Sequence, residues 1–318
     1  SITFSISGTD LAVTSGGVIT FVTAPDFETT PSYTATLTAT DEINSSTQSI
    51  TVNVTDVNEM PTFTSLASFD ADENQTTIGS VTADDVDSSS ITFSISGSDL
   101  ALTSDGTLSF VTAPDYETKS SYSATVTASD GDLSATQAIT VNVNNLNDNA
   151  PVFTSSTSFS SDENQTSIAT VTASDADDSS LSFSVSGSEL PITDSGALSF
   201  ASAPDYETKS SYTATITVSD GVASVTQNIT VSINNLNDNA PVFTSSASFS
   251  AAENQTAIGT VTATDADGNS MSFSISGSEL SISAAGQLSF IAAPDYETKT
   301  TYTATATVSD GNLSATQT

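Results

Sequence analysis

The chain of 318 residues contains no cysteine, no histidine and no tryptophan, and only 3 of its residues are Lys or Arg. Without cysteine it forms no disulfide and offers no thiolate to a metal or a substrate. Without histidine it lacks the usual general base at neutral pH and the usual zinc ligand. Carboxylate, amide and hydroxyl groups are therefore left to carry any chemistry.

The shortage of basic residues leaves a formal net charge of -35, because 38 residues are Asp or Glu. Such a surface repels phosphate backbones and anionic lipid, so we expect no nucleic-acid partner and no docking on a membrane. No apolar run approaches the roughly 18 residues of a membrane-spanning helix, so we expect no direct membrane insertion by this segment. Its natural partners are cations.

The sequence repeats with a period of 90 residues. Pro61, Pro151 and Pro241 open three nearly identical segments, and the string PDYE returns at the same interval. The earlier string PDFE stands 89 residues before the first PDYE, so one residue is missing from the first linker. We predict four domains at 1–59, 60–149, 150–239 and 240–318, the first and last incomplete, as expected of a window from a longer array.

Within each copy, apolar residues alternate with Ser or Thr at a period of two, and turn signals such as Ser-Asp-Gly separate the runs. Examples are the segments 167–174, 181–187, 196–202, 212–220 and 226–235. Many short strands in a unit of this size predict an all-β fold of β-sandwiches. We expect Phe183, Phe200, Tyr212 and Ile216 in the core of the third copy.

The acidic residues cluster in the turns and strand ends, in the strings DENQ, SDAD, PDYE, SDG and NLNDN. Asp and Asn favour turns, but Glu163 and Glu207 have no such turn chemistry. Carboxylates gathered at one end of a sandwich need a counter-charge, and Ca²⁺ binds 6 to 8 oxygen ligands of these types. The pattern therefore predicts calcium sites.

These five strings, in this order, resemble the calcium-binding signature of cadherin repeats, and the likeness covers essentially the whole chain. The resemblance implies tandem seven-stranded Greek-key β-sandwiches, cadherin-like and Ig-like, in a linear array. It also implies up to about three Ca²⁺ at each complete junction between repeats. The ligands would come from both repeats and from the linker.

Carried over by motif, the ligands at the junction of the second and third copies are Glu73, Asp115, Glu117, Asn145, Asn147, Asp148, Asn149, Asp175, Asp177 and Asp220. At the next junction they are Glu163, Asp205, Glu207, Asn235, Asn237, Asp238, Asn239, Asp265, Asp267 and Asp310. The first junction offers Asp26, Glu28, Asp56, Asn58, Glu59, Asp85, Asp87 and Asp130. Glu253, Asp295 and Glu297 lack a linker, so we expect this last site to be empty or weak.

Two departures from the cadherin pattern bear on affinity. The linkers at Asn145 and Asn235 begin with Asn where the family has Asp, which removes one charge and weakens the site. The first linker is one residue shorter and has Glu59 in place of an Asp, so we expect fewer ions there or a different angle between repeats.

The sequence is most similar to the extender region of a large bacterial surface adhesin. We predict a calcium-rigidified extracellular stalk, secreted or anchored by other regions, that mediates adhesion, surface attachment or biofilm formation and is not an enzyme. Its partners would be calcium ions, neighbouring repeats of a longer chain, and another cell, surface or polysaccharide. Alternatives are a carbohydrate-binding array, with Tyr116, Tyr206 and Tyr296 as its candidates, and a filament subunit assembled by strand complementation. A glycosidase would not repeat its carboxylate pair in every copy.

Overall fold

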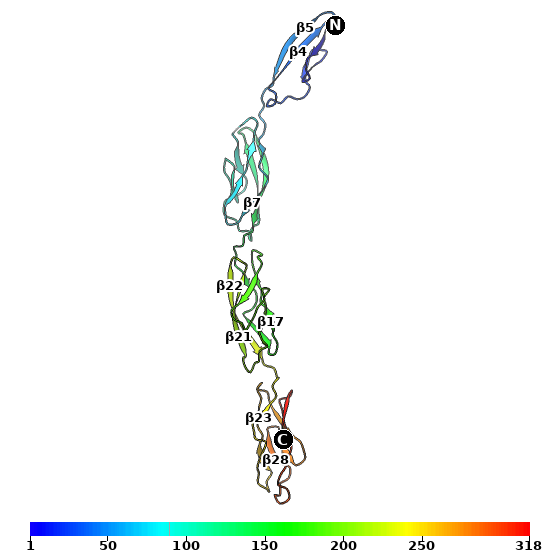
Figure 1. Ribbon diagram of the computed structural model, residues 1–318. Helices are drawn as coiled ribbons and strands as arrows, with labels where there is room; N and C mark the ends of the chain where they lie inside the picture. Colours follow the sequence, from blue (N-terminus) through cyan, green and yellow to red (C-terminus); the bar gives the residue numbers. More distant parts are fainter. Residues whose placement is uncertain (89) are drawn as a thin grey trace. The chain divides into compact units, whose positions relative to one another are not determined.

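The computed structural model describes residues 1–88 and 90–318 (Figure 1). These residues form two compact units, Ser1–Leu146 and Asn147–Thr318. Strands, turns and bends make up these described ranges, and no helix occurs in them. The prediction of an all-β fold is therefore confirmed. No helix capable of crossing a membrane is present in the described part of the chain. The finer division into four domains stays a prediction.

The described residues of the first unit contain fourteen strands, which form two successive groups of sheets. The first group is β1-β4-β5 and β2-β3, and the second is β10-β13-β14-β7, β11-β12-β8 and β6-β9. The bounds are β1 (Thr3–Ile6), β2 (Leu11–Val13), β3 (Ile19–Phe21), β4 (Ser32–Thr40), β5 (Ser45–Asn53), β6 (Thr62–Phe63), β7 (Ser68–Asp72), β8 (Thr77–Ser80), β9 (Ala83–Asp84), β10 (Thr92–Ile95), β11 (Leu100–Leu102), β12 (Thr107–Phe110), β13 (Ser121–Ser129) and β14 (Ser134–Asn144).

The second unit repeats the pattern with the sheets β16-β22-β21-β19, β17-β20 and β15-β18, followed by β26-β29-β30, β24-β28-β27 and β23-β25. The bounds are β15 (Val152–Phe153), β16 (Ser158–Asp162), β17 (Ser167–Thr170), β18 (Ala173–Ser174), β19 (Ser182–Val185), β20 (Ala197–Ser199), β21 (Ser211–Ser219), β22 (Ser224–Asn234), β23 (Val242–Phe243), β24 (Ala257–Thr260), β25 (Ala263–Thr264), β26 (Ser272–Ile275), β27 (Leu280–Ile282), β28 (Gln287–Phe290), β29 (Ala306–Ser309) and β30 (Ser314–Gln317).

The period-two alternation places one side of each long strand in a hydrophobic core. In β22, Ile229, Val231 and Ile233 are between 0% and 5% exposed, whereas the intervening Thr230 and Ser232 face solvent. Successive side chains of a strand point to opposite faces, so the alternating sequence gives each sheet one buried and one hydrated face. The second and third copies each enclose a core of this kind.

The predicted core residues Phe183, Phe200 and Ile216 are buried, but Tyr212 is only half-buried. Its ring packs edge-on against Phe200 with the ring centroids 5.1 Å apart. The Lys209 ammonium lies 4.2 Å from the centroid of the Tyr212 ring. The tyrosine therefore closes the edge of the core instead of filling its centre, in keeping with its polar tip.

The segment 167–174, predicted as one strand, is divided between two sheets. β17 pairs with β20, whereas β18 pairs with β15. Between them the Val171 N–H donates to the Gly196 carbonyl over 2.8 Å. Gly196 has a φ of +87°, and a Cβ there would lie 2.2 Å from the Val171 carbonyl oxygen. Glycine is thus required at this crossing on both conformational and steric grounds.

A parallel pairing positions the acidic end of the third copy. β16 runs parallel to β22, and Asp162 is paired with Asn234 at the ends of the two strands. The chain continues from β16 into Glu163 and from β22 into the linker that begins at Asn235. Parallel strands end at the same edge of a sheet, so this register brings the DENQ motif beside the linker.

Candidate metal centres

Glu163 is a buried carboxylate held by two main-chain hydrogen bonds. The side chain is 2% exposed. Its Oε2 accepts the Tyr206 N–H over 2.8 Å, and its Oε1 accepts the Leu236 N–H over 2.7 Å. One side chain thus joins the DENQ turn, the PDYE turn and the linker. Buried carboxylates are seldom found without such partners.

Glu163, Glu207 and Asp238 form an acidic cluster in which each contributes a carboxylate oxygen, all within 4.8 Å of one another. Loss of hydration raises the pKa of Glu207, and the charges of Glu163 and Asp267 act in the same direction. Close like charges disfavour ionisation, so a cation at this position would be strongly favoured.

The linker is tied to the fourth copy through Asp267. Its Oδ2 accepts the N–H groups of Asp238 over 3.0 Å and of Asn239 over 2.8 Å. Its Oδ1 accepts the Asn239 side-chain amide over 2.8 Å. Although burial opposes the charged form, these hydrogen bonds lower the pKa of Asp267. The carboxylate is therefore ionised at neutral pH and fixed in orientation.

Three buried oxygens near this linker have no hydrogen-bond partner: Asn237 Oδ1, Asp265 Oδ2 and Asp310 Oδ2. The other oxygen of Asp265 accepts the Asn269 N–H, and the other oxygen of Asp310 accepts two main-chain N–H groups at 2.7 and 2.6 Å. Each carboxylate is therefore oriented by one oxygen while the second is unsatisfied. A buried unpaired acceptor is costly and requires an explanation.

The same arrangement occurs 90 residues earlier in the second unit. Asn147 Oδ1, Asp175 Oδ2 and Asp220 Oδ2 are also buried without partners. Asp177 accepts the N–H groups of Asp148 and Asn149 over 3.0 and 2.7 Å, as Asp267 does in the next copy. The unsatisfied oxygens are consequently a property of the repeat and not of one turn.

In the first unit, Glu73 reproduces the geometry of Glu163. It is 2% exposed and accepts the N–H groups of Tyr116 and Leu146, each over 2.8 Å. Glu73 and Glu117 offer carboxylate oxygens within 4.8 Å of each other. Asp115 accepts both the N–H and the hydroxyl of Thr118, as Asp205 does from Thr208. The PDYE turns are thus closed by their own aspartates.

The first junction lies wholly within the first unit and differs in detail. Glu28, Glu59 and Asp87 have carboxylate oxygens within 4.8 Å of one another. Asp87 Oδ2 accepts the Glu59 N–H over 2.7 Å, and the Asn58 amide donates to Asp130 over 2.8 Å. At the later junction, Asn239 donates both its main-chain N–H and its side-chain amide to Asp267. The first linker is one residue shorter and has no counterpart of this asparagine.

The pKa of Glu59 is raised to about 7 by its hydrogen bond with Asp87, by lost hydration and by the charges of Asp87, Glu28 and Asp56. By contrast, the pKa of Asp87 is lowered chiefly by the hydrogen bond from the Glu59 N–H. Asp85 contributes one further buried oxygen without a partner.

Two further predicted ligand residues, Asp26 and Asn235, take part in hydrogen bonds. Asp26 accepts the hydroxyl of Thr29 over 2.9 Å and closes the PDFE turn. The Asn235 amide donates to the Asp267 carbonyl over 3.0 Å.

The last acidic cluster, Glu253, Asp295 and Glu297, has carboxylate oxygens within 4.8 Å of one another, but all three residues are exposed. Glu253 accepts the Tyr296 N–H over 3.0 Å, as Glu163 accepts the Tyr206 N–H. The cluster lacks the burial of Glu163, and the expectation of an empty or weak site here stays a prediction.

One contact was missed from the sequence. The Asn164 amide donates to Asp238, so the residue after Glu163 also binds the linker. Asn164 has a φ of +65°, as its counterparts Asn74 and Asn254 have values of +64°. The return of Asn after Glu in each DENQ-type string was the available signal, because Asn tolerates the left-handed region better than most residues.

Comparison with known proteins agrees with this architecture. Residues 237–318 match a family described as Bacterial Ig domain. The chain is 33% identical over 260 residues to Protocadherin Fat 4 of Mus musculus, which covers 71% of this chain and 5% of that protein. It is 34% identical over 154 residues to Chitinase A of Pseudoalteromonas piscicida, covering 48% of this chain and 19% of the enzyme.

Among solved structures, Protocadherin Gamma B2 extracellular cadherin domains 3-6 superpose with a TM-score of 0.66 and 26% identity, covering 99% of this chain and 90% of that one. The chain is an array of tandem cadherin-like repeats. This confirms the resemblance drawn from the DENQ, PDYE and linker motifs. These cadherin-like repeats span only 5% of the length of Protocadherin Fat 4, so they correspond to a small part of that protein.

Proposed function

We propose that this chain is a calcium-stiffened segment of an extracellular stalk that acts in adhesion or attachment to a surface. The cadherin-like fold supports an adhesion role. The match to a bacterial Ig domain and the net charge of -35 support a bacterial surface protein. Ca²⁺ at the junctions would convert a flexible linker into a fixed joint.

The unsatisfied buried oxygens carry this proposal. Asn237, Asp265 and Asp310 each present one such oxygen, and the same positions recur 90 residues earlier in the chain. Ca²⁺ would satisfy these oxygens together, since it takes 6 to 8 oxygen ligands. The donor set fits calcium better than zinc, because it contains carboxylate and amide oxygens and the chain has no histidine or cysteine.

At the junction inside the second unit, Glu163, Glu207 and Asp205 come from the third copy, Asn235, Asn237, Asp238 and Asn239 from the linker, and Asp265, Asp267 and Asp310 from the fourth copy. Ions held by these groups would bridge both copies. Without them, the carboxylates of Glu163, Glu207 and Asp238 repel one another. Calcium therefore supplies both the attraction and the rigidity of the joint.

The affinity expected for an extracellular module is about 10⁻⁴ to 10⁻³ M. With 10 mM Ca²⁺ each occupied site would then stabilise the folded chain by about 1.4 to 2.7 kcal/mol. Calorimetric titration and thermal unfolding with and without a chelator measure these effects, and small-angle scattering should show a shorter particle after chelation. If neither the melting temperature nor the scattering profile changes between calcium and chelator, the proposal is wrong.

Asp265→Asn provides a variant test with a matched control. It removes the charge of a carboxylate that has one buried, unsatisfied oxygen, whereas Asp194→Asn makes the same change in an exposed turn of the third copy. We expect the calcium-induced rise in melting temperature to fall in the first variant and to be unchanged in the second. Equal responses would show that the unsatisfied oxygen is not a ligand.

The first junction should bind fewer ions than the junction within the second unit. Asp87 receives one main-chain N–H from the linker, at 2.7 Å, whereas Asp267 receives two together with an amide. A linker that fixes its carboxylate less completely pre-organises the site less well. Titration of residues 1–146 and 147–318 as separate fragments would compare the two.

Carbohydrate binding is a second candidate, favoured by the similarity to part of a chitinase. Among the recurrent tyrosines, Tyr296 is 64% exposed, but Tyr116 and Tyr206 pack against the cores of their copies. A sugar platform repeated in each copy is therefore not supported by these side chains. A glycan array with a Tyr296→Ala variant would decide whether the last copy binds sugar.

A further inference from the structure

The three lysines of the chain occupy the same place in three successive copies of the repeat. Lys119, Lys209 and Lys299 are its only basic residues, and they are spaced by 90 positions. Each ammonium lies 2.6 Å from a carboxylate oxygen of the acidic residue 20 positions earlier, which is Asp99, Glu189 and Glu279 in turn. Three cations change little in the balance against 38 acidic residues, so their role is a local one.

In the third copy, Lys209 is held by a carboxylate and an aromatic ring. Its ammonium donates to both oxygens of Glu189, over 2.6 and 2.8 Å. It also lies 4.2 Å from the centroid of the Tyr212 ring. Glu189 belongs to the loop between β19 and β20, whereas Tyr212 belongs to β21. We call the three side chains the lysine clamp, because the ammonium connects this loop to the sheet.

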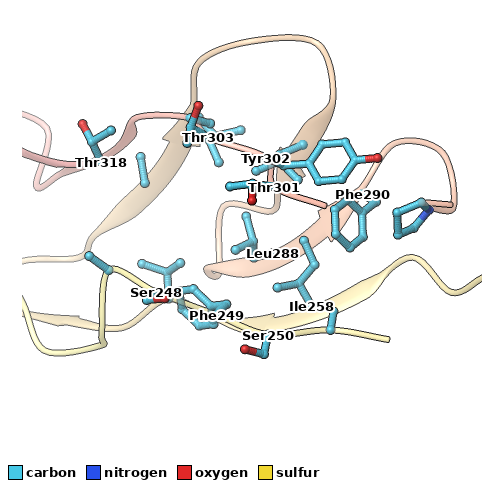
Figure 2. Close-up of a pocket in the computed structure, with 18 of the residues that line it drawn as sticks. Ser248, Phe249, Ser250, Ile258, Leu288, Phe290, Thr301, Tyr302, Thr303 and Thr318 are labelled. Atoms are coloured by element: carbon cyan, nitrogen blue, oxygen red, sulfur yellow. The ribbon is translucent and has the colours of Figure 1, made fainter. Parts of the chain in front are cut away.

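The fourth copy repeats the clamp. Figure 2 shows the Tyr302 ring beside Phe290, and the two ring centroids are 4.9 Å apart. The Lys299 ammonium lies 4.6 Å from the centroid of the Tyr302 ring and donates to both oxygens of Glu279. The arrangement of ammonium, carboxylate and ring is therefore a property of the repeat.

The main chain of Lys209 closes the turn that carries two predicted calcium ligands, Asp205 and Glu207. The Lys209 N–H donates to the Asp205 carbonyl over 2.9 Å. Glu207 lies inside this turn and contributes a carboxylate oxygen to the acidic cluster of the junction. One residue thus closes the turn with its backbone and connects it to the Glu189 loop with its side chain.

The first copy shows the turn without a lysine. Thr30 stands at that position, and its N–H still donates to the Asp26 carbonyl, over 2.9 Å. The ammonium is therefore not needed to form the turn. What it adds in the later copies is a second attachment, which restrains the turn from outside.

We propose that Lys209 and Glu189 are positioning residues that hold the PDYE turn of the third copy ready for calcium without being ligands themselves. This inference rests on the calcium function proposed above. A restrained turn loses less conformational freedom when Asp205 and Glu207 take up an ion. The paired side chains are 41% and 61% exposed, so the contribution is modest. Breaking the clamp should weaken calcium binding at this junction by about two- to fivefold.

The two charges by themselves would give a different pattern. Loss of the Lys209 charge would make the surface more negative and tighten cation binding, whereas loss of the Glu189 charge would weaken it. A positioning role instead predicts weaker binding in both Lys209→Gln and Glu189→Gln, because each substitution breaks the same ion pair. Lys209→Arg keeps the charge and the pair, so it should bind calcium as the natural chain does. Asp194→Asn removes a negative charge from the same copy without touching the clamp.

Hydrogen exchange of the full chain, measured by mass spectrometry on the segment 204–210, tests the proposal. In chelator, the N–H groups of this turn should exchange faster in Lys209→Gln and Glu189→Gln, because the turn opens more often. The calcium concentration that slows this exchange should rise by the factor given above in both variants, and by less in Asp194→Asn. Lys299→Gln makes the same change in the fourth copy and should leave the segment unaffected.

Three results decide between the explanations. Unchanged exchange of the segment in chelator would overturn the clamp. Tighter calcium binding in Lys209→Gln, with weaker binding in Glu189→Gln, would show an effect of charge alone and overturn the positioning role. If exchange accelerates in chelator but calcium changes it neither in the natural chain nor in the variants, the restraint of the turn is supported and the calcium function is wrong.

Discussion

Replacing Glu163 by glutamine perturbs a buried carboxylate that the fold holds by two main-chain N–H groups, at 2.8 and 2.7 Å. The amide of glutamine has one oxygen, so its NH₂ group would face one of these donors. An unpaired buried donor costs about 1 to 3 kcal/mol. Relief of repulsion from Glu207 and Asp238 offsets part of this cost when no cation is present.

Calcium should enlarge the effect of Glu163→Gln, because the variant then also loses a charged ligand. The additional loss should approach the 1.4 to 2.7 kcal/mol expected for one occupied site at 10 mM Ca²⁺. Thermal and denaturant unfolding of the chain, each in chelator and in calcium, measure the difference.

Glu253→Gln is the matched control, since Glu253 occupies the same place in the next copy but is exposed and accepts a single main-chain N–H, from Tyr296 at 3.0 Å. Its effect should be within about 0.5 kcal/mol in either condition. The reasoning is refuted if Glu163→Gln destabilises the chain equally in chelator and in calcium, or if both variants behave alike.

Three further changes test the fold and the first junction. Gly196→Ala should destabilise the third copy by more than about 1 kcal/mol, because its Cβ would lie 2.2 Å from the Val171 carbonyl oxygen; chemical denaturation measures this. Ile216→Ala, at a residue 0% exposed, should cost about 2 to 5 kcal/mol, whereas Ile43→Ala, at one 90% exposed, should have little effect on unfolding. Since the pKa of Glu59 is raised to about 7, stability in chelator should increase as pH falls from 7 toward 5, and Glu59→Gln should remove this dependence.

The sign of the Glu59 effect follows from proton binding. The folded state, with a pKa of about 7, holds the proton at a pH where the unfolded chain has released it. Lower pH therefore favours the folded state until the unfolded carboxyl is protonated as well. A pH-independent melting temperature in chelator would contradict the crowding of Glu59 with Asp87 and Glu28.

The sequence by itself determined the 90-residue repeat, the all-β fold class and the restriction of any metal site to oxygen ligands. A 90-residue period and alternating β-branched residues are local properties, so they could be read without knowing which strands pair. The inward positions of Phe183, Phe200 and Ile216 follow from that alternation. The absence of cysteine and histidine limited any metal site to oxygen ligands.

Only the tertiary structure decided how distant segments meet. Glu163 contacts residues 43 and 73 positions away, and Asn164 binds a linker residue 74 positions away. The parallel register of β16 and β22 creates these contacts, and the division of segment 167–174 between two sheets depends on the close approach of Gly196. Strand order and register are long-range properties that alternation does not specify, which is why the unsatisfied oxygens of Asp265 and Asp310 emerge only from the fold.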